Sequence, residues 1–253
     1  MELKIFYTVV IFIFGLLFGS FFNVVGWRVP KGLSIVKPGS FCPKCKHKLR
    51  WYELIPVFSY LIQGGKCRSC KARIAPFYTI TELFTGILFA LSYWFLGFSF
   101  EFIIAVITAS FFSIVLVSDI NFLIIPDQFT LIISAIVVIL RLVLVGAEDA
   151  IFSLIYGIGA FVIMYLLMIL GNFILKKESL GGGDIKLMFY IGIAVGPWMS
   201  LFSIFLSSFI AFPLSLFLFI KNKNNVIPYG PFLLMACFII IIFKIDLYSI
   251  LNI

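Results

Sequence analysis

Long, uninterrupted apolar runs dominate the chain and predict membrane-spanning helices. The runs are continuous rather than alternating every second residue, which favours helices over β-strands. Within the last third, the apolar stretch from Leu187 to Ile220 is too long for one crossing, and Gly196-Pro197 divides it because proline breaks a helix. We therefore expect an all-α polytopic membrane protein with about eight transmembrane helices, at approximately 3–26, 77–97, 101–118, 128–146, 150–174, 185–197, 199–220 and 230–252.

One polar excursion interrupts this pattern. Residues 27–76 are rich in Lys, Arg, Gly, Pro and Cys, and they predict a small subdomain outside the membrane. The preceding run carries Glu2 and Lys4 instead of a basic start, and it is long enough to span, so we interpret it as a retained helix rather than a cleaved signal peptide. The expected organisation is a first transmembrane helix (1–26), a four-cysteine subdomain (27–76) and a membrane core (77–253).

Composition and charge fit this picture. The chain is 63% hydrophobic and 12% charged, which excludes an ordinary soluble domain. Its formal charge is +8, and eleven of the 19 basic residues lie between Arg28 and Arg73. An even number of apolar runs separates the Lys-rich segments, so these segments lie on the same side of the membrane. The positive-inside rule predicts that this side is the cytoplasm. The charge is thus a topology signal, and we expect no nucleic-acid partner.

Two C-x-x-C pairs lie in the polar subdomain, with 21 residues between them. This spacing predicts one tetrahedral zinc ion held by four thiolates, a structural site with no open position for water. A redox-active dithiol pair is the alternative, although a reducing cytosol disfavours disulfides. His47 is either a substitute ligand or a solvated loop residue, and Cys237 is expected to be a small apolar residue. The predicted ligands are Cys42, Cys45, Cys67 and Cys70.

Two aspartates lie at the ends of apolar runs, on the same predicted side. Carboxylates are costly near lipid, so Asp119 and Asp184 are candidate functional residues. Asp184 follows three glycines, which leave room for another backbone, although a loop followed by an acidic N-cap would give the same sequence. Asp127 follows Pro126 and reads as a first-turn acid of the next helix. Lys186 is close enough in sequence to tune the pair.

Paired carboxylates suit acid–base hydrolysis. Two close carboxylates share one proton, so the ionised member can activate water while the protonated member polarises a carbonyl. Asn23 and Glu82 are further polar residues within apolar runs. Each is either a polar contact between helices or part of a substrate groove.

The ordered motifs resemble the type IV prepilin peptidase family almost from end to end. These motifs are Gly19–Val24, Arg28–Pro30, Cys42–Cys45, Trp51–Glu53, Ile55–Leu61, Gly65–Cys70, Asp119 with Ile125–Asp127, Gly181–Lys186 and Pro228–Leu233. The resemblance implies an aspartic protease of the Gly-x-Gly-Asp type with Asp119 and Asp184 as its catalytic pair. It implies prepilin or pseudopilin substrates, cut after a leader glycine on the cytosolic side of a bacterial inner membrane. It also implies N-methylation of the new N-terminus with S-adenosylmethionine in many members, for which this sequence shows no glycine-rich fingerprint.

Two other classes remain as alternatives. A proton-coupled transporter also carries membrane carboxylates, but its acids are expected near mid-bilayer and within inverted repeats. A non-catalytic assembly scaffold would use the cysteine subdomain for docking. It predicts that Asp119→Asn and Asp184→Asn leave function intact.

Overall fold

The computed structural model describes residues 1–176, 180–220 and 227–246. Eight long helices appear where the apolar runs predict them, and within the described ranges the only β-pairings are two isolated bridges, so the predicted all-α class is confirmed. Three short elements, η1 (Val29–Lys31), η2 (Trp51–Glu53) and α2 (Phe58–Ile62), belong to the polar excursion. The long helices are α1 (Glu2–Arg28), α3 (Pro76–Leu96), α4 (Phe100–Phe122), α5 (Asp127–Leu144), α6 (Ala147–Leu175), α7 (Gly182–Val195), α8 (Pro197–Ile220) and α9 (Gly230–Ile242).

Two of these helices are shorter than a bilayer is thick. Six others are long and apolar enough to cross a membrane. Helix α7 has 14 residues and α9 has 13, so they are only about 20 Å long, against a hydrocarbon core of about 30 Å. Helix α7 is separated from α8 at Gly196, whose φ is +82°, and Pro197, as predicted. Helix α9 ends at Ile242, well before the predicted boundary at 252, and residues 247–253 lie outside the described part of the chain.

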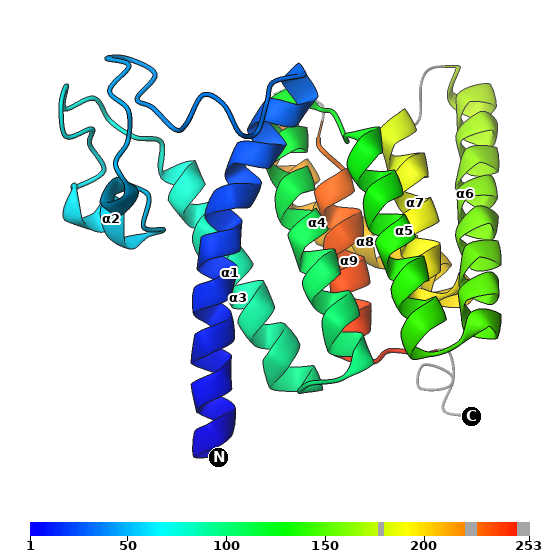
Figure 1. The fold of residues 1–253 in the computed structure, drawn as a ribbon. Coiled ribbons are helices and arrows are strands. Elements are labelled where there is room, and N and C mark those ends of the chain that lie inside the picture. The colour runs from blue at the N-terminus through cyan, green and yellow to red at the C-terminus, as the bar shows by residue number, and fades with distance from the viewer. Residues whose placement is uncertain (177–179, 221–226, 247–253) are drawn as a thin grey trace.

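The core lies around α4 and α9. Helix α4 contacts α1, α3, α5 and α9, and α9 also packs against α7 and α8 (Figure 1). Ten of the 13 residues of α9 are buried, which explains its sequence: a helix that is apolar on all sides is an interior helix.

The long helices alternate in direction. In Figure 1 the C-terminal ends of α1, α4, α6 and α8 lie at the upper end of the bundle, together with the first turns of α5, α7 and α9. The short α3–α4, α5–α6 and α7–α8 connections lie at the lower end, with the N-terminus. The polar excursion and both aspartates are therefore at one end, as the parity of the runs predicts. That this end is cytosolic remains a prediction.

Two polar residues of the membrane helices have structural partners. Asn23 of α1 donates from Nδ2 to the Tyr78 carbonyl (3.0 Å) and accepts from Thr81 Oγ1 (2.6 Å), both on α3. Glu82 of α3 accepts from the Val57 N–H (2.9 Å), at the start of α2. Asn23 therefore joins two helices, and Glu82 ties the polar excursion to α3.

Candidate active site and metal centre

Asp119 lies in the last turn of α4 and is 5% exposed. The helix ends just beyond it, where Leu123 takes a left-handed conformation and its N–H bonds to the Asp119 carbonyl (2.9 Å). The Asp119 carboxylate lies beside Gly230, the first residue of α9: a Cβ placed on Gly230 would be 3.2 Å from its Oδ2. An acid at a helix C-terminus opposes that helix's dipole, and the start of α9 offsets this by supplying a positive helix end.

Asp184 occupies the first turn of α7 and is 8% exposed. The N-cap is Gly181, so the interpretation of Asp184 as an N-cap is wrong: it is the third helical residue. Its carboxylate lies back against the N-cap: a Cβ placed on Gly181 would be 3.2 Å from Asp184 Oδ2. A first-turn acid also interacts favourably with the helix dipole.

The two carboxylates share one cleft. Both line an open cavity of about 1180 Å³, and Asp119 is near enough for its charge to act on Asp184. Ile125, in the loop between α4 and α5, fills the space between the first turns of the two short helices. A Cβ placed on Gly183 of α7 would lie 3.1 Å from the Ile125 side chain, and one on Gly230 of α9 would lie 2.7 Å from it. Glycine at both positions allows this close approach.

Asp127 is set apart from this pair. It is the first residue of α5, after Pro126 at the N-cap, and its side chain is 57% exposed. Lys186 donates to both of its carboxylate oxygens at 2.7 Å. The interpretation of Asp127 as a first-turn acid is consistent with this geometry. The described partner of Lys186 is Asp127 rather than a member of the buried pair.

Tyr229 fixes the start of α9 to α8, a role that the sequence did not reveal. Its hydroxyl is 2.6 Å from Ser207 Oγ and donates to the Ile204 carbonyl (3.1 Å). Pro231 has no N–H, and the Phe232 N–H bonds back to the Tyr229 carbonyl. Gly230, between Tyr229 and Pro231, is the residue of this first turn that lies against Asp119. The segment Pro228–Pro231 is recognisable in the sequence as part of a motif, but nothing in the sequence connects it with Asp119.

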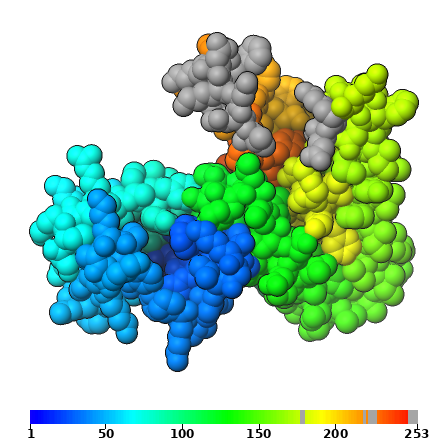
Figure 2. Space-filling model, turned by 90° about the horizontal axis from the view of Figure 1, so that it is seen from above, coloured from blue at the N-terminus to red at the C-terminus, as the bar shows by residue number. Residues whose placement is uncertain are grey.

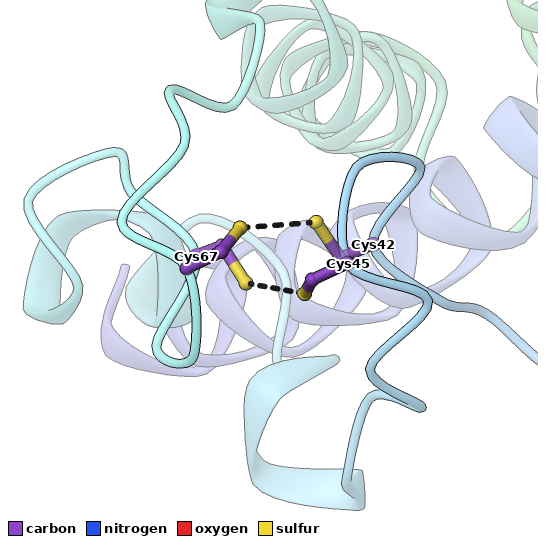
Figure 3. Close-up of side chains that lie close together, drawn as sticks. Cys42, Cys45 and Cys67 are labelled. Atoms are coloured by element: carbon purple, nitrogen blue, oxygen red, sulfur yellow. Dashed lines mark hydrogen bonds between the residues drawn. The ribbon is translucent and has the colours of Figure 1, made fainter.

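The four cysteines of the polar excursion come together as predicted. Sγ of Cys42 lies 3.8 Å from Sγ of Cys70, and Sγ of Cys45 lies 3.9 Å from Sγ of Cys67 (Figure 3). All four sulfurs lie within 4.8 Å of one another. These separations exclude disulfides, whose S–S length is about 2.05 Å. They match the edge of a tetrahedron built on Zn–S bonds of about 2.3 Å, which is about 3.8 Å.

Two equivalent hairpins present these sulfurs. In the first, the Cys42 N–H bonds to the His47 carbonyl (2.9 Å) and Lys46 has φ +60°. In the second, displaced by 25 positions, the Cys67 N–H bonds to the Ala72 carbonyl (2.8 Å) and Lys71 has φ +57°. The N–H groups of Cys45 and Lys44 lower the pKa of the Cys42 thiol to about 6, whereas, against the His47 backbone, burial and the neighbouring thiols raise the pKa of the Cys45 thiol to about 11, so Cys42 ionises first.

His47 is not part of the four-cysteine cluster, and it is not simply solvated either. Its Nε2 lies 3.2 Å from Oε2 of Glu53, which also accepts from the Arg50 N–H at 2.9 Å. The Arg50 N–H, with the nearby His47, holds the pKa of the Glu53 carboxyl below its ordinary value. Glu53 is buried, and its contact with His47 supports the first hairpin. Cys237, as expected, is a buried residue of α9.

The fold and the site define a polytopic helical membrane protein with a carboxylate pair in an open cleft and a cluster of four cysteines that could hold a metal ion. Residues 13–96 match the bacterial peptidase A24 N-terminal domain, and residues 105–216 match the type IV leader peptidase family. A prepilin leader peptidase/N-methyltransferase of Bacillus subtilis is 38% identical over 198 residues, covering 78% of this chain and 77% of the relative. One from Vibrio cholerae is 31% identical and covers 95% of this chain and 98% of the relative. The chain therefore belongs to the type IV leader peptidase family. No solved structure matches it.

Proposed function

We propose that this chain is an aspartic endopeptidase that removes the leader of type IV prepilins or pseudopilins, with Asp119 and Asp184 as its catalytic pair. The observation that carries the proposal is the meeting of two buried carboxylates, 65 positions apart in the chain, at one open cleft. Its relatives are named prepilin leader peptidase/N-methyltransferase, which supports prepilins as the substrate class.

The chemistry follows from the pair's surroundings. Two interacting carboxylates at a desolvated site share one proton. The ionised member takes a proton from water as that water attacks the scissile carbonyl, and the protonated member donates a hydrogen bond to the carbonyl oxygen. Each carboxylate lies beside a glycine at the start of a short helix, Asp119 beside Gly230 and Asp184 beside Gly181.

The cleft opens at the end of the bundle that carries the basic excursion, which we propose faces the cytosol of a bacterial inner membrane. The scissile bond of a substrate whose basic leader precedes an apolar helix would lie at the same membrane boundary. Cleavage after the leader glycine would therefore leave the helix in the bilayer.

N-methylation of the new N-terminus is a second proposed activity. It is supported by the relatives' names and by the four-cysteine subdomain that lies within the matched N-terminal domain. S-adenosylmethionine is the proposed methyl donor. Zinc is the proposed occupant of the cysteine site, in a structural role, because four thiolates at tetrahedral spacing leave no open position for water.

The test is cleavage of a model prepilin by the purified protein in detergent, read by mass spectrometry. Asp119→Asn and Asp184→Asn should each lower the rate by about 10²–10⁴-fold, the usual contribution of a general acid or base. Asp127→Asn is the matched control: it removes an exposed carboxylate of the same cleft and should still cleave.

Three outcomes would contradict the proposal. Cleavage that survives either change in the buried pair would mean that the pair is misassigned. Loss of cleavage with Asp127→Asn alone would move the chemistry to Asp127. A folded wild type that cleaves no prepilin but moves protons or solutes in proteoliposomes would be a transporter, and one that does neither would be a scaffold.

A further inference from the structure

Helix α2 in the polar excursion has an inverted pattern of exposure. Phe58, Leu61 and Ile62 are three and four positions apart, so they share one side of the helix, and all three are exposed, Ile62 to 76%. Ser59 and Tyr60, between them, are more buried, and the Tyr60 ring lies against Gly65. A helix on the surface of a water-soluble subdomain would place its apolar side inward. This helix places it outward.

The adjoining element extends the same surface. Element η2 packs against α2, and its Trp51 is 78% exposed. Leu54 follows directly and is also exposed. We call this surface the apolar face: Trp51, Leu54, Phe58, Leu61 and Ile62. Large apolar residues gathered in this way on a small subdomain mark an interaction site.

Positive charge dominates the exposed surface of the polar excursion. Glu53 is the one acidic residue in the sequence from 27 to 76, and it is buried, whereas ten basic side chains are exposed there. Apolar residues with Trp on one side and Lys and Arg around them are typical of protein segments that lie in a membrane interface. The exposed basic residues are Lys31, Lys37, Lys44, Lys46, Lys48, Arg50, Lys66, Arg68, Lys71 and Arg73.

The position of the subdomain agrees with a bilayer partner. Figure 1 shows α2 beside the upper half of α1, below that helix's C-terminal end. Figure 2, which looks along the helices, shows residues of the polar excursion extending sideways from the bundle instead of covering its end. A bilayer around the bundle would occupy the region beside α1. Both ends of the excursion are also tied to membrane helices, through α1 and through the Glu82–Val57 hydrogen bond to α3.

We propose that the apolar face is inserted into the headgroup and upper acyl region of the bilayer, while the surrounding Lys and Arg side chains bind the phosphates of anionic phospholipids. The four-cysteine subdomain is then an interfacial element rather than one that projects into water. The apolar face supplies burial of Trp51 and the α2 side chains, and the basic residues supply attraction that depends on lipid charge. The inference is independent of the catalytic pair.

The test uses the full chain in nanodiscs, with brominated phospholipid and acrylamide as membrane and water-borne quenchers of tryptophan. The emission lost on Trp51→Phe gives the Trp51 component. Brominated lipid should quench that component by about half or more, and acrylamide should quench it little, as for a side chain in the interface. Trp198→Phe gives a positive control, because Trp198 is exposed at the start of the membrane helix α8, so brominated lipid should quench its component as well.

Lipid charge provides a second measurement that needs no variant. Quenching by brominated lipid should rise when phosphatidylglycerol replaces part of the phosphatidylcholine, and fall in high salt, because exposed charges are screened. A Trp51 component that responds to acrylamide and not to brominated lipid would overturn the proposal. So would a Trp51 that becomes shielded from acrylamide only when a prepilin is added, since the partner would then be the substrate.

Discussion

Gly230→Ala is expected to distort the cleft that holds Asp119 and Asp184 through three contacts at once. The added Cβ would lie 2.7 Å from Cδ1 of Ile125, 3.2 Å from Oδ2 of Asp119 and 3.2 Å from Cδ1 of Leu187. The first distance is shorter than carbon atoms allow, so Ile125 or the start of α9 must move. Overpacking of this kind costs about 1–3 kcal/mol.

The effect on cleavage should exceed the effect on stability. Gly230 lies against the Asp119 carboxylate, so a shift at the start of α9 displaces the carboxylate that we propose reacts. A misplacement near 1 Å can lower a rate by about 10²-fold. We expect cleavage of a model prepilin to fall by about that factor, with KM changed less than kcat, in a protein whose midpoint of thermal unfolding drops only moderately.

Ile125→Val separates the two effects. Valine lacks Cδ1, so in the double variant the 2.7 Å clash is gone while the contact with Asp119 remains. Stability should recover in part and kcat should recover less, which a double-mutant cycle measures. Gly159→Ala on α6 is the control, because a Cβ there meets nothing within 4 Å. An unchanged kcat in Gly230→Ala would show that the contact with Gly230 does not position Asp119.

The remaining predictions concern the subdomain and its attachment. Cys42→Ser should abolish binding of about one zinc ion per chain, measured by elemental analysis, whereas Cys237→Ser should retain it, because Cys237 is buried in α9 far along the chain. Asn23→Ala removes two hydrogen bonds between α1 and α3 and should destabilise the protein by about 1–3 kcal/mol in thermal unfolding, and an unchanged midpoint would argue against that contact. Val57→Gly should stabilise the subdomain against proteolysis, because Val57 has φ +62°, a conformation that is costly for a β-branched residue. Faster cleavage by the protease would contradict this.

The sequence predicted the helices well because hydrophobic length is the strongest signal that a membrane imposes. It also predicted the division at Gly196-Pro197 and the meeting of the four cysteines. It overestimated α9, since the apolar run continues past Ile242, where the helix ends. The family and the enzyme class indicated by the motifs are confirmed by the comparisons. The division at 26 and 76, the catalytic pair and the metal's identity stay predictions.

The details of the cleft could not be predicted because they depend on contacts between distant segments. The sequence Pro228–Pro231 indicates the start of a helix, but only the fold brings Gly230 of this segment to Asp119. The place of Ile125 against both Gly183 and Gly230 is likewise a tertiary contact. The role of Glu53 depends on a hydrogen bond to His47, and the 25-residue displacement between the hairpins is visible mainly in their backbone bonds, because few side chains repeat.

Because the four cysteines come from two equivalent hairpins, the cysteine site affects the segment between the hairpins. Each hairpin supplies two sulfurs, so neither can hold a tetrahedral ion alone, and one bound ion closes a loop that contains η2 and α2. Joining the two hairpins at one ion would restrict the conformations open to the loop and so lower the entropy cost of ordering it. A segment with almost no core of its own can then present a fixed surface. A metal ion bound there would thus join the two hairpins, and its removal would release the whole loop, including side chains that never touch the metal.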